Sequence, residues 1–151
     1  ETVTLSSSAS SIDFTGISQD YRHLAIKIVT KAVSNEESGL LRFNNDNASN
    51  YTWQFANGYG TGTNAQYNSE SGITNGYYDN DTFNSTLIEV YDYTSTDKYT
   101  TILHRGGAAG GGIRFGAGTW NNTAAVTQVN IRANSATSLA AGVVVSLYGI
   151  G

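Results

Sequence analysis

Tyrosine rings gather in one polar segment of the sequence, where their chemistry suits them to binding a ligand. Tyr59, Tyr67, Tyr77 and Tyr78 lie within residues 57–81, among many Asn, Gly and Ser residues. A tyrosine ring stacks on sugars or on apolar protein surface, and its hydroxyl forms hydrogen bonds, at a low cost in side-chain entropy. The sequence therefore predicts a recognition site here. The alternative is that the rings pack against the body of the protein or against another subunit.

Trp120 and a short acidic cluster are the other candidates for ligand binding. Trp120 precedes three polar residues, so we expect it to anchor the end of a strand, either in the core or as a platform for a ligand. Asp79 and Asp81 place two carboxylates close together, and calcium is commonly bound by such oxygen ligands. Their spacing is not that of an EF-hand. The two aspartates are candidate ligands for Ca²⁺, with an unoccupied acidic turn as the alternative.

Side chains that could perform catalysis are few and dispersed. The chain has no Cys, and its two histidines, His23 and His104, lie in strand-like segments without an acid or a nucleophile nearby in the sequence. Glu36-Glu37 and Glu70 lie in predicted loops, where solvated carboxylates are the ordinary case. A carboxylate pair that hydrolyses glycosides needs a defined separation, which two loop acids rarely have. We therefore expect a protein that is not an enzyme.

The composition argues against two classes of partner. The 151 residues include 8 Lys plus Arg and 12 Asp plus Glu, for a formal net charge of −4. Binding to nucleic acid or to an anionic membrane needs concentrated positive charge, so we expect neither. Charged residues make up only 13% of the chain, and polarity comes instead from Ser, Thr, Asn and Gly. Such compositions are common in secreted and particle-forming β proteins.

Short β-type runs that must position these side chains alternate with turn-rich segments along the whole chain. In the clearest strand, residues 22–30, we expect Leu24, Ile26 and Ile28 to share one buried face. The other predicted strands are residues 2–5, 11–14, 40–43, 51–55, 86–93, 99–105, 113–120, 125–133 and 142–150. This pattern predicts an all-β fold in a single domain over residues 1–151, an antiparallel β-sandwich of jelly-roll type.

Turn signals between these runs predict two hairpins and two long loops. The hairpins join residues 40–43 to 51–55 and residues 86–93 to 99–105. The loops are residues 57–81 and the glycine-rich residues 106–112. The glycine-rich stretch lacks the Lys-Ser/Thr pair of a phosphate-binding loop, and no helix follows it, so we expect a simple connection there.

The last strand carries apolar residues on both of its faces. Val143, Val145 and Leu147 alternate with Val144, Tyr148 and Ile150. Such a strand is expected to be covered on both sides. Either a central place in a sandwich or a neighbouring subunit would supply the cover.

Several motifs, in order along the chain, resemble those of a group of phage-encoded virion proteins found in phages of aquatic bacteria. The motifs are Glu1-Thr-Val-Thr-Leu5, Ser11-Ile-Asp-Phe-Thr-Gly-Ile17, Tyr21-Arg-His-Leu-Ala-Ile-Lys-Ile28, Leu41-Arg-Phe-Asn44, Ser49-Asn-Tyr51, Ile88-Glu-Val-Tyr-Asp-Tyr93, Lys98-Tyr99, Gly118-Thr-Trp-Asn-Asn-Thr-Ala-Ala-Val126 and Ser146-Leu-Tyr-Gly-Ile150. Together they cover nearly the whole chain. One departure is Ser18, where the family pattern often has Pro; it touches only a turn.

The resemblance implies a structural domain on the exterior of the virion, without catalytic residues. It implies a homo-trimer that contacts other virion proteins of the capsid or the tail. Two roles stay open: a head decoration or cement protein that locks capsid subunits, and a tail-fibre tip domain that binds a host surface glycan. The alternative outside this class is a secreted carbohydrate-binding module of a cellular enzyme.

Overall fold

The computed structural model describes residues 1–34, 37–108, 112–134 and 137–151, apart from the side chains of Glu37 and Tyr59. These residues form strands and turns and contain no helix, which confirms the all-β prediction. None of the described segments is a helix able to cross a membrane. The strands are β1 (Thr2–Thr4), β2 (Ser11–Thr15), β3 (His23–Thr30), β4 (Glu37–Phe43), β5 (Tyr51–Tyr59), β6 (Gly62–Glu70), β7 (Ile73–Tyr78), β8 (Asn84–Tyr91), β9 (Thr100–Ala108), β10 (Gly112–Trp120), β11 (Gln128–Ala133) and β12 (Val144–Ile150).

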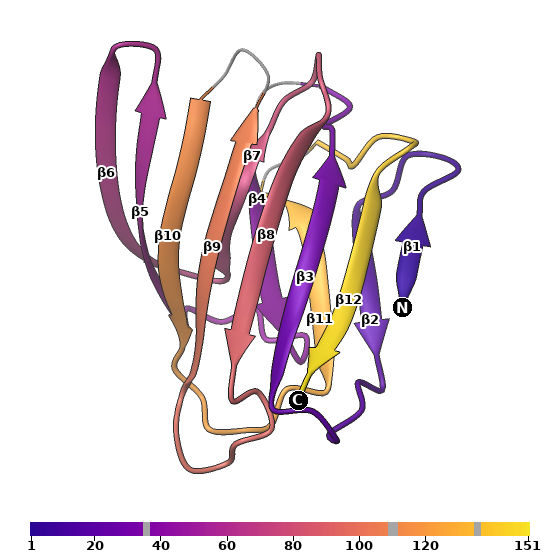
Figure 1. Cartoon of the computed structure of the whole chain (residues 1–151), viewed down its shortest axis with the longest axis vertical. Helices are drawn as coiled ribbons and strands as arrows, with labels where there is room; N and C mark the ends of the chain where they lie inside the picture. Colours follow the sequence, from indigo (N-terminus) through magenta and orange to yellow (C-terminus); the bar gives the residue numbers. More distant parts are fainter. Residues whose placement is uncertain (35–36, 109–111, 135–136) are drawn as a thin grey trace.

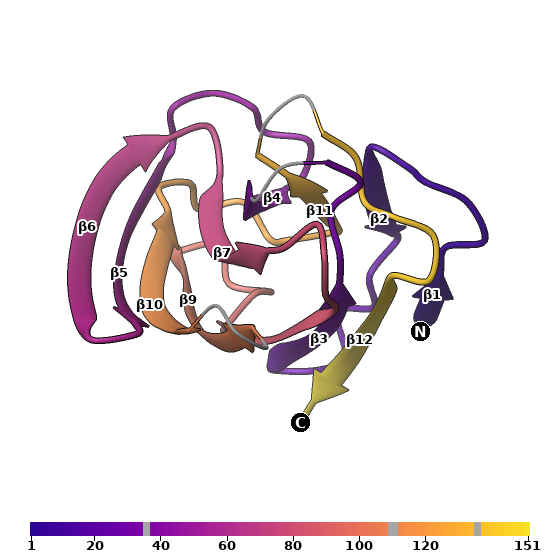
Figure 2. The ribbon, with the colours of Figure 1, turned by 90° about the horizontal axis from the view of Figure 1, so that it is seen from above.

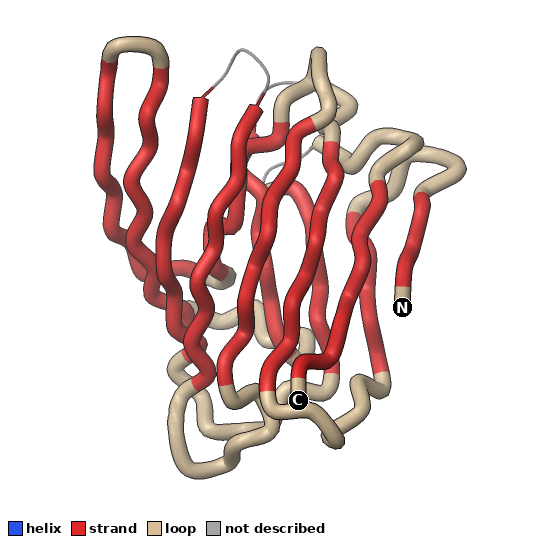
Figure 3. The backbone as a smooth tube through the Cα atoms, in the orientation of Figure 1, coloured by secondary structure: helices blue, strands red, loops and turns tan. Residues whose placement is uncertain are grey.

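The strands form two antiparallel sheets (Figures 1 and 3). The larger sheet has eight strands in the order β1-β12-β3-β8-β9-β10-β5-β6, and the smaller has four in the order β2-β11-β4-β7. Seen from above, the larger sheet curves around the smaller one (Figure 2). The two facing sheets are consistent with a β-sandwich.

The core lies between the sheets because the central strands, such as β3, β8 and β11, alternate buried apolar side chains with more exposed ones. Leu24, Ile26 and Ile28 of β3 are all buried, as predicted. They belong to one hydrophobic cluster that includes Phe14 of β2 and Leu41 of β4 in the opposite sheet. Each fully buried side chain of this size contributes about 1.5–3 kcal/mol to stability. Burial therefore fixes the register of every strand that crosses the centre of the sandwich.

One predicted hairpin is confirmed and the other is wrong. Strands β8 and β9 pair directly, with Val90 opposite Ile102. Strands β4 and β5, by contrast, belong to different sheets, so residues 44–50 carry the chain from one sheet to the other. Asn44 and Asn45 both adopt positive φ there, at 50° and 57°. Turn residues of this kind serve a crossover as well as a hairpin, and the sequence did not separate the two.

The predicted long loop over residues 57–81 is also wrong, because most of it is strand. Strand β5 continues to Tyr59, β6 spans Gly62–Glu70 and β7 spans Ile73–Tyr78. Strand β6 carries exposed polar side chains almost throughout, so its backbone pairing with β5 defines it rather than any apolar pattern. In the glycine-rich stretch, residues 106–108 continue β9 and Gly112 begins β10, while residues 109–111 lie outside the described part.

Candidate functional site

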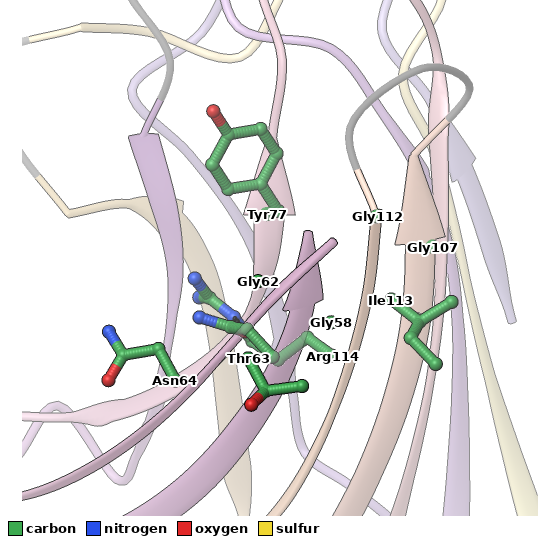
Figure 4. A pocket seen from close by; sticks show the side chains of 11 residues that line it. Gly58, Gly62, Thr63, Asn64, Tyr77, Gly107, Gly112, Ile113 and Arg114 are labelled. Carbon is green, nitrogen blue, oxygen red and sulfur yellow. Dashed lines mark hydrogen bonds between the residues drawn. The ribbon is translucent and has the colours of Figure 1, made fainter. Parts of the chain in front are cut away.

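A pocket of about 340 Å³ opens at one end of the sandwich (Figure 4). It lies between the β5–β6 hairpin, the adjoining ends of β9 and β10, and Tyr77 near the end of β7. Five glycines line it, so backbone forms much of its wall. The polar side chains that line it are Asn57, Thr63, Asn64, Tyr77 and Arg114.

Arg114 is the charged group of this pocket and is held rigidly. Its Nε donates to Asn57 Oδ1 at 2.7 Å, and its Nη1 donates to Ser38 Oγ at 3.1 Å and to the carbonyl of Gly76 at 2.9 Å. Its guanidinium lies 4.2 Å from the centre of the Phe55 ring. These contacts join β10 of the larger sheet to β4 and β7 of the smaller one. The guanidinium is thus preorganised by four neighbours.

The positive charge of Arg114 has no acidic partner within the part of the chain that the structure describes. The ion pairs found there involve Asp92 and Glu89, not Arg114. The residue is only 8% exposed, and burial lowers the pKa of Arg114 below its usual value. Arginine nevertheless stays protonated in proteins. A charge that is partly removed from water without an opposite charge favours an anion nearby.

His104 lies on the inner, buried face of β9. It is 4% exposed, and neither ring nitrogen has a hydrogen-bond partner among the described residues. Burial, with a smaller contribution from the charge of Arg114, lowers the pKa of His104 to about 4. Its neighbour across the sheet is Gly116, where a Cβ atom would come within 2.6 Å of His104 Nε2. The imidazole is therefore neutral at pH 7 and packed into the core.

The structure separates the aromatic rings that the sequence grouped together. Tyr77 lines the pocket, and Tyr67 is exposed on β6 outside it. The side chain of Tyr59 lies outside the described part. Tyr78 and Trp120 are both buried, as in the alternative in which these rings pack against the body of the protein. Tyr78 donates to Asn75 Oδ1, and Trp120 Nε1 donates to Asp46 Oδ2.

The two aspartates proposed as calcium ligands lie in a tight turn after β7. Asp79 accepts hydrogen bonds from the backbone N–H of Asp81 and from the hydroxyl of Thr82. These bonds, led by the one from Asp81, lower the pKa of Asp79. Over the described ranges, no group of three or more His, Cys, Asp or Glu side chains is placed to hold a metal ion. The visible role of Asp79 is to stabilise this turn.

A second surface, of which the sequence indicated only the side of the last strand that carries Tyr148, is the outer face of the eight-stranded sheet. We define this outer face by five large apolar side chains that are 44% to 63% exposed: Val29, Leu103, Ile113, Phe115 and Tyr148. They come from β3, β9, β10 and β12. Two shallow grooves of about 530 and 770 Å³ run over it. Strand β12 is thus covered on one face and exposes Tyr148 on the other.

The strand register places these side chains in continuous rows. Lys27 lies opposite Leu87, Leu87 opposite Arg105, and Arg105 opposite Phe115. Residues directly opposite each other in antiparallel strands point to the same side of the sheet. Both grooves are lined by Arg105 and Phe115. The outer face is therefore one surface, and Phe115 lies within it.

Both signs of charge are present on the outer face. Arg105 approaches Glu89 at 3.9 Å, and Lys27 Nζ lies 5.1 Å from the centre of the Tyr148 ring. Arg105 and Glu89 are partly exposed, so the ion pair between them contributes little to the stability of the single chain.

Comparison with known proteins adds no relative: no protein-family model matches the chain, and no curated protein matches it in sequence.

Proposed function

We propose that this chain is a non-enzymatic structural domain on the exterior of a bacteriophage particle, and that it assembles through the outer face of its eight-stranded sheet. The observation that carries the proposal is the exposure of Phe115, Ile113 and Leu103 together on one side of the sheet. The order of sequence motifs adds the virion setting. Assembly through this face would suit a decoration or cement protein, whose role is to lock capsid subunits together.

Exposed apolar surface of this kind favours association. Burying apolar area contributes about 25 cal/mol per Å², and contiguous exposed patches generally mark interaction sites. We propose that further copies of the same chain cover the outer face. Glu89 and Arg105 lie beside the apolar rows, so two copies can offer each other opposite charges. The trimer that the resemblance implies would bring three such faces around one axis.

The jelly-roll type of sandwich is part of this proposal. The chain alternates between sheets along its first half, with β2 and β4 in the smaller sheet and β3 and β5 in the larger. Repeated crossing of this kind favours a jelly roll over a simple meander.

Sedimentation velocity tests the assembly. The wild-type chain should sediment at about three times its 16.1 kDa mass, and Phe115→Glu should give monomers because it places a charge in the buried interface. Tyr99→Glu is the matched control, since Tyr99 is equally exposed but lies in the turn before β9. A wild-type monomer at tens of micromolar, or an F115E variant that assembles like the wild type, contradicts the proposal.

A second role is favoured by a different observation, the pocket around Arg114. A tail-fibre tip domain that binds a host surface glycan needs a concave polar site near the end of the fold. The pocket has that position and lining. A chain that binds saccharides but stays monomeric would instead favour the alternative, a secreted carbohydrate-binding module.

A further inference from the structure

We infer that the pocket around Arg114 binds an acidic saccharide and that Arg114 receives its carboxylate. The inference rests on the glycan-binding role proposed above and specifies the class of sugar. Its starting point is the guanidinium itself. Figure 4 shows the Arg114 side chain extending into the space between Tyr77 on one side and Thr63 and Asn64 on the other.

The hydrogen bonds of Arg114 leave one nitrogen for a ligand. A guanidinium has five N–H groups, one on Nε and two on each Nη. Asn57 takes the Nε hydrogen, while Ser38 and Gly76 take both hydrogens of Nη1. Among the described residues Nη2 has no acceptor, and it does not belong to the fully buried polar atoms that lack a hydrogen-bond partner. Nη2 therefore has both hydrogens available to an oxygen that enters the pocket.

The charge of the pocket selects an anion. Arg114 is only 8% exposed and lacks an acidic partner within the described ranges. A ligand carboxylate would supply the missing charge, and hydrogen bonds between ions are about twice as strong as neutral ones. A neutral sugar would leave the charge uncompensated. The pocket is therefore matched to a carboxylate.

The remaining lining suits the rest of a sugar ring. Thr63 and Asn64, on the exposed strand β6, contribute side chains that can donate and accept hydrogen bonds. Tyr77 contributes an aromatic ring. Hydroxyl groups and the apolar face of a sugar need these two kinds of partner. A volume of about 340 Å³ is at the lower end of the range for small-molecule sites. We expect one acidic residue of a longer saccharide to enter.

Titration followed by NMR of the ¹⁵N-labelled chain tests the inference. The probes are an oligogalacturonate, its methyl ester and inorganic phosphate. The acid should shift the side-chain signals of Asn64 and Arg114. The ester should bind at least about tenfold more weakly than the acid, because it lacks the charge. Arg114→Lys should lose most of the preference for acid over ester.

A second variant keeps the test independent of folding, because Arg114 also holds the two sheets together. Asn64→Ala changes an exposed side chain of β6 and should weaken binding of the acid without lowering the melting temperature. Asn68→Ala, on the same strand outside the pocket, should leave binding unchanged.

The outcomes separate the two claims. Equal binding of acid and ester at the pocket overturns the acidic-saccharide inference but leaves glycan binding intact. Absence of binding by every saccharide overturns both, and saturable binding of phosphate with no binding of the acid assigns the site to a phosphate-bearing ligand instead.

Discussion

Individual residues decide the chemistry of this molecule, and the most informative is an arginine in an unexpected place. In β10, Ile113 and Phe115 point outward while Arg114 points inward. This is the reverse of the usual pattern, in which apolar side chains face the core. The inversion gives the pocket its charge and the outer face its apolar character at once. One three-residue segment thus contributes to both proposed binding surfaces.

His104 gives a prediction about pH at the same scale. Burial lowers its pKa to about 4 in the folded protein, from the ordinary histidine value of 6.5. The unfolded chain therefore binds a proton more readily between these values, and the folding stability present above pH 6.5 is lost as the pH falls towards 4. The loss should reach roughly 3 kcal/mol.

Urea unfolding at pH 7.0 and 4.5 measures this effect. The His104→Leu variant, which has no titrating group at this position, should lose distinctly less stability than the wild type over the same interval. Equal losses in the two proteins would mean that His104 is not the group responsible.

Sequence reasoning found only part of the site at this scale. Tyr77 was identified from its polar, aromatic surroundings, and it does line the pocket. Arg114 was missed because nothing near it in the sequence resembles a binding motif. The available signal was the inverted alternation of Ile113, Arg114 and Phe115. Tyr78 and Trp120 were candidates on the same grounds, but an aromatic ring beside polar residues can be buried when its polar atom finds a partner, as both do here.

The strands differ in how clearly their sequence patterns predict them, which explains why β6 and β7 were mistaken for a loop. Strands β3, β8 and β9 alternate apolar and polar residues and were predicted close to their observed bounds. Strand β6 has no apolar face because it is an edge strand beyond the smaller sheet. Strand β7 contains Asn75-Gly76 and resembles a turn, yet it is buried. Tertiary packing overrides local turn propensity in β7.

The pairing of β4 with β7 yields a prediction about glycine. The strands shift register beside Gly39, where a Cβ atom would lie 2.2 Å from both the Tyr78 ring and Asn75 Oδ1. Gly39→Ala should therefore destabilise the protein by about 1–3 kcal/mol through overpacking. At Gly107 in β9 the nearest atom to an added Cβ lies at 3.6 Å, so Gly107→Ala is the control and should change stability little.

Thermal unfolding followed by circular dichroism compares these two variants. A melting temperature for G39A within error of that for G107A would show that the register shift is looser than the structure indicates.

The whole molecule combines two different surfaces, a polar pocket at one end and an apolar outer face along the larger sheet. The alternation of strands predicted the all-β fold and the two facing sheets. It could not predict the outer face, because that depends on which strands become neighbours. Exposed Leu103 and Phe115 are distant in sequence from Val29 and Tyr148 and meet only in the folded sheet.

Salt dependence distinguishes the forces that hold the proposed assembly together. The outer face is mainly apolar, and its few charges are exposed. Association should therefore persist in 1 M sodium chloride and strengthen in sodium sulfate, which favours burial of apolar surface. Sedimentation velocity across these buffers gives the association constant. Dissociation of the wild-type assembly at high salt would assign it to ion pairs instead.

The most direct test of the central claim is a cryo-electron microscopy structure of the assembled protein on its particle. The account predicts that the outer face of the eight-stranded sheet is covered by neighbouring copies, with the ring of Phe115 buried between subunits. The opposite result is an assembly in which Phe115, Leu103 and Ile113 all face solvent while other surfaces make the contacts. That result would contradict the proposed role of the outer face.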